Sequence, residues 1–257
     1  MGEALLSGLL RAGTPPDDIV ATARREERAK LIESRYGIST FANDAAAGHA
    51  STLLITVKPQ DMERLLQEIA GSVTPEHLVV SVAAGIPTAF IERRLNGDVP
   101  VVRVMSNTPV LVDEAMSVIS AGRHATEEHL RRTEELLGHV GKVVRVPESQ
   151  QDAVTALSGS GPAYFFYLVE AMIDAGILLG LPRTVAADLI VQTALGSAVM
   201  LRDTGEHPVK LREAVTSPAG TTINAIRELE KHGVRAALIA AIEAARDRSQ
   251  QLASGHE

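Results

Sequence analysis

Strand-like and helix-like segments alternate through the first 146 residues, and after Pro147 the strand-like segments stop. The strand-like segments are rich in Val and Ile and are bounded by Gly, Pro, Asn or Asp. Apolar strands that alternate with helices indicate a parallel sheet covered on both faces. The predicted strands are residues 18–24, 51–57, 77–84, 99–106, 115–121 and 141–147. The predicted helices among them are residues 3–12, 25–36, 60–70, 87–95 and 125–139.

The second part of the chain has a helical pattern only, interrupted by the turn-forming segments SGSGP, GLP, TGEHP and SPAGT. The helices predicted there are residues 149–158, 162–180, 183–203, 208–214, 221–231 and 233–253. We therefore predict an α/β domain at residues 1–147, followed by an all-α domain at residues 148–257.

Composition excludes several kinds of chemistry. The chain has no Cys, so it has no disulfides, thiolate nucleophiles or Cys-based zinc sites, and the lack of Cys suits a reducing, cytoplasmic compartment. The eight His residues lack metal-ligand spacing, and no metal site is expected. A net charge of −7 without a basic cluster argues against nucleic-acid binding. The first ten residues lack the basic segment and cleavage site of a signal peptide.

The most apolar run, residues 163–181, has the length of a membrane span. Glu170 and Asp174 interrupt it, and we find no equally apolar span after it. We therefore expect no membrane insertion, and we predict a helix buried in a core or at a subunit interface.

The chain begins MGEALLSGLLRAG, which is typical of the helix that follows a dinucleotide-binding G-x-G-x-x-G turn. Gly2 occupies the place of the last glycine in that turn. We expect roughly a dozen further residues upstream, which would supply a first strand and the two leading glycines. Without that central strand the sheet would split into two fragments with unpaired edges. An ordinary amphipathic first helix without a cofactor is the alternative.

Four strand ends carry residues suited to a nucleotide. Arg24 and Arg25 follow the strand at 18–24, where Arg suits a 2′-phosphate, although a basic pair at a helix start is also a common surface feature. The next three strands end in VKPQ, VAAGIP and MSNTP, where small residues and prolines allow a flat ring to approach the backbone. Three such loops at one edge of one sheet predict a shared cleft.

The segment TSPAGTT is the densest cluster of small and hydroxyl side chains in the helical part. Pro218 and Gly220 break any helix there, and Thr221 or Thr222 is a suitable N-cap for the helix that follows. A helix start also offers free amides to an anion such as a carboxylate, and the hydroxyls of Ser217 and Thr222 would add donors. Capping and anion binding both remain open.

A second dense segment is ALSGSGPAY. Ser160 before Gly161 and Pro162 resembles an N-cap with Pro in the first helical turn, which explains most of the pattern. An active-site role for Ser158 or Ser160 is the lesser alternative.

The segments LSGSGPAY, MSNTP, VKPQ, VAAGIP and PVKLREAVTSPAGTTINAIRELE resemble pyrroline-5-carboxylate reductase, and the resemblance covers essentially the whole chain. The chain departs from that family's pattern at two places. Ala219 replaces the first glycine of the commoner S-P-G-G sequence, and the first strand with its leading glycines does not precede Gly2.

The resemblance implies a Rossmann-like NADPH-binding domain, with NADH as an alternative donor, followed by a helical domain that forms homodimers and assembles further into a decamer. The implied cofactor contacts are Gly2, Arg24, Arg25, Asn43, Val57, Lys58, Pro59, Ala83, Ala84, Gly85 and Asn107. Among these, Asn43 would contact the adenosine end, the two arginines the 2′-phosphate and Asn107 the nicotinamide ribose. The residues implied to hold the substrate carboxylate, across the dimer, are Ser217, Gly220, Thr221 and Thr222.

The reaction implied is hydride transfer from NADPH to the C=N carbon of Δ1-pyrroline-5-carboxylate, which gives L-proline. Thr222 would also donate a hydrogen bond to the ring nitrogen. Two alternatives stay open. A hydroxyacid dehydrogenase is disfavoured because the apolar run at 163–181 lacks a catalytic Lys. A non-catalytic paralogue that dimerises without binding NADPH is the other.

Overall fold

The computed structural model describes residues 1–254, which form two compact units. The first unit contains residues 1–160 together with the residues from 245 onward, and the second contains residues 161–244. The predicted division at residue 147 remains a prediction.

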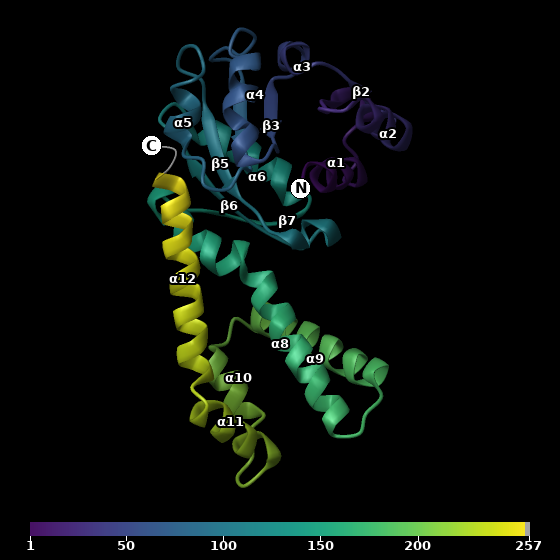
Figure 1. The fold of residues 1–257 in the computed structure, drawn as a ribbon, viewed down its shortest axis with the longest axis vertical. Coiled ribbons are helices and arrows are strands. Elements are labelled where there is room, and N and C mark those ends of the chain that lie inside the picture. Colours follow the sequence, from purple (N-terminus) through teal and green to yellow (C-terminus); the bar gives the residue numbers. More distant parts are fainter. Residues whose placement is uncertain (255–257) are drawn as a thin grey trace. The chain divides into compact units, whose positions relative to one another are not determined.

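A five-stranded sheet in the order β3-β4-β5-β6-β7 forms the centre of the first unit (Figure 1). Its strands are β3 (Thr52–Ile55), β4 (Leu78–Ser81), β5 (Val101–Met105), β6 (Ala115–Ala121) and β7 (Gly141–Arg145). β3, β4 and β5 are parallel, as predicted. β6 runs antiparallel to β5, and β7 is parallel to β6. The sheet is therefore mixed, because residues 106–114 are too few for the crossover that a parallel neighbour of β5 would need.

Helices cover both faces of this sheet, as predicted from its apolar strands. Val79 and Val80 point to opposite faces and belong to separate apolar clusters. On the Val79 face lie α3 (Asn43–His49), α4 (Met62–Ile69) and α5 (Thr88–Glu92). On the Val80 face lie α1 (Gly2–Arg11) and α6 (Glu127–Gly138). The sequence does not predict α3, a short Ala-rich helix.

A separate two-stranded parallel sheet pairs β1 (Val20–Ala21) with β2 (Ser39–Thr40), and α2 (Glu26–Tyr36) connects them. This small sheet shares no backbone ladder with β3, the edge strand of the large sheet. The split into two sheet fragments agrees with the sequence analysis. The strand predicted at 18–24 is only two residues long, and β2 is not predicted at all.

Side-chain hydrogen bonds connect α1 to α2. The Glu3 carboxylate accepts hydrogen bonds from Arg28, from Arg35 Nη1 at 3.1 Å and from the Tyr36 hydroxyl at 2.9 Å. Arg28, followed by Tyr36, lowers the pKa of Glu3 below its ordinary value of 4.5. A lowered pKa means that ionised Glu3 stabilises the folded chain above pH 4.5, and that this stabilisation is lost as the pH falls through the folded-state value.

The helical part begins with a 3₁₀ turn (Glu148–Gln150), α7 (Gln151–Val154) and a π-helical turn (Thr155–Gly159). It continues with α8 (Gly161–Leu178), α9 (Arg183–Thr204), α10 (Pro208–Ala214), α11 (Thr221–Lys231) and α12 (Val234–Ser254), which lie close to the predicted bounds. The predicted N-cap at Ser160 is wrong. Ser160 has helical backbone angles, because the π-helical turn leads directly into α8.

The apolar helices α8 and α9 are largely exposed within the described chain. Tyr167 and Leu178 on α8 are 72 % and 88 % exposed. Burial of the 163–181 run in this chain's own core is therefore wrong. It is also wrong that no equally apolar span follows, since an 18-residue stretch within the helix at residues 183–204 has a mean hydropathy of 1.6. By length and composition alone, both this helix and the 148–178 run could cross a membrane.

Replacement of Glu3 by Gln should lower the free energy of unfolding at pH 7, because the carboxylate loses its charge-assisted contacts with Arg28 and Arg35. The loss should be only about 1 kcal/mol, because these contacts are partly exposed. Below pH 4.5 the difference from the wild type should fade. Urea unfolding across pH 3–8 measures both effects. Glu26→Gln, which breaks the exposed pair with Lys30, is the matched control and should change little. Equal effects of the two substitutions at every pH would contradict this account.

Candidate active site

The carboxyl ends of β3, β4 and β5 lie side by side, because these strands are parallel neighbours. The predicted cofactor segments 57–59, 83–85 and 107 follow these three ends. Val57 packs against the core, Lys58 is exposed, and Pro59 begins a 3₁₀ turn. The structure thus brings the three segments to one edge of the sheet, where α/β proteins bind ligands.

Arg24 and Arg25 follow β1 and are exposed. The Arg24 guanidinium lies 3.6 Å from the carboxylate of Asp61, in the 3₁₀ turn that Pro59 begins. Arg24 therefore lies beside the loop after β3, although β1 belongs to the other sheet. Asn43, at the start of α3, donates from Nδ2 to Glu68 at 2.6 Å, so its side chain contacts α4.

Small residues dominate this edge. Ala83 is buried, Ala84 is exposed, and Gly85 has a φ of +73°, a left-handed conformation that favours glycine. Gly2 begins α1, and a Cβ there would lie 2.5 Å from the Thr56 hydroxyl beyond β3. The start of α1 therefore approaches β3 closely. An edge with small residues and an exposed arginine pair fits a dinucleotide with a 2′-phosphate.

Asn107 follows β5 and is 9 % exposed. Its Nδ2 donates to the Ser158 carbonyl at 3.1 Å, and its Oδ1 accepts from the Met116 amide at 2.9 Å. The Ser158 carbonyl can accept this bond because Pro162, four residues later, has no N–H to offer. In this structure Asn107 links the end of β5 to the π-helical turn, and its predicted contact with the ribose remains a prediction.

The two serines of the SGSGP segment lie in or next to that turn. The Ser160 amide donates to the Thr155 carbonyl at 2.8 Å, the five-residue spacing of a π-helix. The Ser158 hydroxyl donates back to the Val154 carbonyl at 3.2 Å. Both contacts lie within the helix itself, and an active-site role for either serine remains a prediction.

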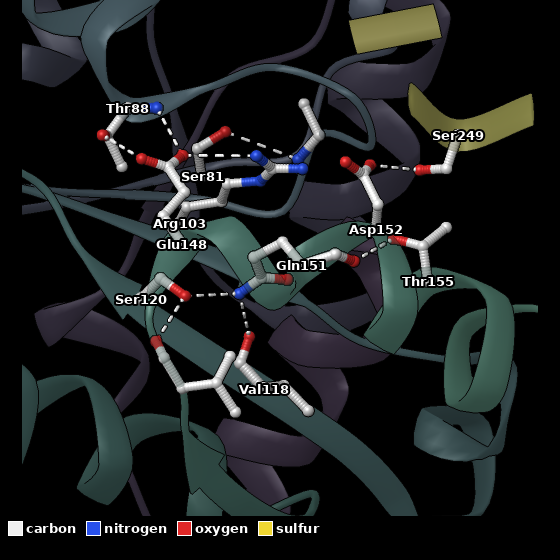
Figure 2. A network of polar contacts seen from close by, with 12 residues as sticks. Ser81, Thr88, Arg103, Val118, Ser120, Glu148, Gln151, Asp152, Thr155 and Ser249 are labelled. Atoms are coloured by element: carbon white, nitrogen blue, oxygen red, sulfur yellow. Dashed lines mark hydrogen bonds and ion pairs between the residues drawn. The ribbon is translucent and has the colours of Figure 1, made fainter. Parts of the chain in front are cut away.

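A polar network around Glu148, in the 3₁₀ turn at 148–150, is not predicted from the sequence (Figure 2). The Glu148 carboxylate accepts from the Thr88 amide at 2.8 Å, from the Thr88 hydroxyl at 2.6 Å and from Arg103 Nη1 at 3.2 Å. Arg103 is buried on β5. An arginine inside the apolar strand VVRVM is the signal in the sequence, since a buried charge requires a partner.

The same network continues along α7. Gln151 is fully buried, and its Nε2 donates to the Ser120 hydroxyl at 2.8 Å and to the Val118 carbonyl at 3.2 Å. Asp152 accepts from the hydroxyl of Ser249, on the last turns of α12, at 2.6 Å (Figure 2). These contacts attach α7 to β6 and to the end of α12.

In the second unit, a tight turn connects α10 to α11. The Gly220 amide donates to the Ser217 carbonyl at 3.1 Å, and Ala219 between them has a φ of +53°. A Cβ on Gly220 would collide with the Ser217 hydroxyl. Glycine at 220 therefore lets this hydroxyl lie over the first turn of α11.

The predicted capping of α11 by Thr221 or Thr222 is wrong. Gly220 is the N-cap, and in the described part of the chain no side chain accepts a capping hydrogen bond there. Thr221 is exposed and Thr222 half-buried, both in the first turn. The first amides of the helix are left for another acceptor, because the first four N–H groups of a helix have no partner within it.

A hollow of 300 Å³ lies beside this helix start. It is lined by Arg212, Glu213, Thr216, Ile223, Ile226, Glu230 and Arg235. None of the four predicted carboxylate ligands lines it. In residues 1–254 no group of three or more His, Asp or Glu residues could hold a metal ion.

Two families match separate parts of the chain. Residues 1–85 match the family described as NADP oxidoreductase coenzyme F420-dependent. Residues 148–252 match the family described as pyrroline-5-carboxylate reductase dimerisation.

Individual relatives match almost the whole chain. Pyrroline-5-carboxylate reductase of Corynebacterium melassecola is 46 % identical over 98 % of this chain and 95 % of its own length. The structure of a pyrroline-5-carboxylate reductase from Coxiella burnetii superposes with a TM-score of 0.92 at 34 % identity, covering 98 % of this chain and 94 % of that one. The Plasmodium falciparum pyrroline carboxylate reductase with NADP bound has a TM-score of 0.88 at 25 % identity, with the same coverage.

The fold and the edge of the sheet define a dinucleotide-dependent oxidoreductase with a helical second part. The chain belongs to the pyrroline-5-carboxylate reductase family. The resemblance found in the sequence, and the fold class predicted from it, are thereby confirmed.

The turn at Ala219 yields a test. A left-handed conformation costs Ala roughly 1 kcal/mol, and a β-branched residue more. Ala219→Val should therefore distort the start of α11 and raise the KM for the substrate about tenfold. Ala219→Gly, the matched control, should leave the KM within about twofold. Steady-state kinetics of the two variants compare them directly, and an unchanged KM in the Val variant would contradict a role for this turn in binding.

Proposed function

We propose that this chain reduces Δ1-pyrroline-5-carboxylate to L-proline, with NADPH as the hydride donor and NADH as an alternative. Membership of the family supports the reaction. The observation that carries the substrate site is the start of α11, which no side chain in the described chain caps. Free amides at the start of an eleven-residue helix suit a carboxylate, because the helix dipole and the N–H groups both favour an anion there.

The cofactor, when bound, supplies the hydride. The residues that we propose to hold it are Gly2, Arg24, Arg25, Asn43, Val57, Lys58, Pro59, Ala83, Ala84, Gly85 and Asn107. The parallel arrangement of β3, β4 and β5 supports the loop residues among them. Two exposed guanidinium groups at the end of β1 support recognition of a 2′-phosphate.

The protein's own part in the reaction is placement. Ser217, Gly220, Thr221 and Thr222 bind the carboxylate through amides and hydroxyls. Thr222 also donates a hydrogen bond to the ring nitrogen. An imine is protonated readily, so the site needs no strong acid, and holding the reacting atoms in line supplies much of the rate.

The exposed apolar side chains of α8 and α9 support homodimer formation through the matched dimerisation domain. A hollow of 180 Å³ between these helices, lined by Met172, Leu181 and Leu189 among others, offers space for side chains of a second copy. We propose that the partner covers these helices in a cytoplasmic enzyme that binds neither nucleic acid nor a membrane. Further assembly into a decamer rests on the resemblance alone.

An assay of the purified chain tests the activity. NADPH absorbance should fall when Δ1-pyrroline-5-carboxylate is added, and L-proline should form in equal amount. A chain that dimerises but consumes no NADPH would instead support the non-catalytic alternative.

Removal of the Thr222 hydroxyl tests the substrate site. Thr222→Ala should lower kcat/KM by about 10–100-fold, as expected for one or two lost hydrogen bonds. Thr222→Ser keeps the hydroxyl and should retain most of the activity. Unchanged kinetics in the Ala variant would remove Thr222 from the site.

Loss of the basic pair tests cofactor selection. The double variant Arg24→Ala with Arg25→Ala should raise the KM for NADPH by on the order of tenfold, and the KM for NADH far less, because only NADPH has a 2′-phosphate. Arg93→Ala with Arg94→Ala, a pair located after α5, serves as the control. Equal effects on both cofactors would mean that Arg24 and Arg25 do not contact the phosphate.

A further inference from the structure

The Glu148 carboxylate holds two elements that are distant from it in the sequence. Its two oxygens accept the Thr88 amide and hydroxyl, and Oε1 also accepts Arg103 Nη1 (Figure 2). Thr88 and Arg103 are buried. The contact between Arg103 and Glu148 is enough to compensate the charge of Arg103. The two hydrogen bonds from Thr88 to Glu148 therefore need a separate explanation.

Thr88 occupies a significant position, because it is the first residue of α5 and directly follows the loop 82–87. α5 has only five residues, so the helix alone does little to order that loop. Glu148 therefore fixes the end of the loop that contains Ala83 and Gly85. The start of that loop is fixed by β4, whose neighbouring strand β5 carries Arg103.

The segment that contains Glu148 is itself well anchored. Gln151 binds Ser120 and the Val118 carbonyl on β6. At the other end of the segment, the Ser158 carbonyl accepts from Asn107, after β5. The segment 148–158 thus contacts the start of α5, directly after the loop that follows β4, at one end and the loop after β5 at the other, all within the first unit.

We propose that Glu148 is a positioning residue for the dinucleotide, acting through Thr88 on the loop 82–87. The proposal rests on the proposed placement of the cofactor at this loop. Glu148 does not contact the reacting atoms. It holds the backbone of Ala83, Ala84 and Gly85 in the conformation that binds the cofactor, so that the loop is ordered before binding.

Glu148→Gln and Thr88→Val test the proposal. The Gln side chain keeps one acceptor oxygen and presents an NH₂ group to donors, and Val removes the Thr88 hydroxyl at nearly constant shape. Thr88→Ser keeps both donors and should restore wild-type behaviour. Glu134→Gln, which removes another carboxylate paired with an arginine, Arg145, is the matched control.

Hydrogen exchange without cofactor is the first measurement. In Glu148→Gln the amides of residues 84–86 and 88 should exchange about tenfold faster, and exchange in β7 should be unchanged. Unchanged exchange at 84–86 and 88 would overturn the proposal, whatever the activity.

Kinetics with NADPH is the second measurement. Glu148→Gln should raise the KM for NADPH about tenfold, with kcat at saturating NADPH and the KM for Δ1-pyrroline-5-carboxylate within about twofold of the wild type. Faster exchange with an unchanged KM for NADPH would show a structural contact only and would overturn the positioning role. A wild-type chain that consumes no NADPH contradicts the proposed function instead, and hydrogen exchange then still decides whether Glu148 holds the loop.

Discussion

The parallel alignment of β3, β4 and β5 is the constraint on which the proposed site depends. Parallel strands end at the same edge, so segments far apart in the sequence follow one another in space there. The loops differ in how they are held. Asp61, after β3, contacts Arg24, and Thr88 and Asn107, after β4 and β5, are both bonded to residues 148–158. The beginning of the helical part thus supports the edge of the sheet with polar contacts.

The two proposed binding regions, at the sheet edge and at the start of α11, would attract an anion in different ways. At the sheet edge, guanidinium groups at 24 and 25 supply positive charge. At the start of α11 no charged side chain is present in the TSPAGTT segment, and the donors that we propose there are backbone amides and hydroxyls. A helix start carries about half a positive charge, so it lowers the pKa of an imine beside it less than a neighbouring lysine or arginine would.

Much of the fold could be predicted because Pro and Gly delimit the elements. The bounds of α10 and α11 agree with the prediction, since Pro208 begins one helix and Gly220 precedes the other. The composition of β6 is that of any buried strand and does not indicate its direction, which follows instead from the short connection at residues 106–114. Contacts such as Glu148 with Thr88 depend on tertiary packing across 60 residues. The Ser158 carbonyl in the π-helical turn likewise accepts a hydrogen bond from Asn107, which follows a distant strand.

The exposed apolar surfaces of α8 and α9 have a consequence for how such a subunit exists in a cell. Much of the apolar burial that would stabilise these helices is not available within one chain, so folding and association become linked. The melting temperature of such a protein rises with its concentration. A newly made subunit at low abundance is exposed to proteases and chaperones until it meets another copy.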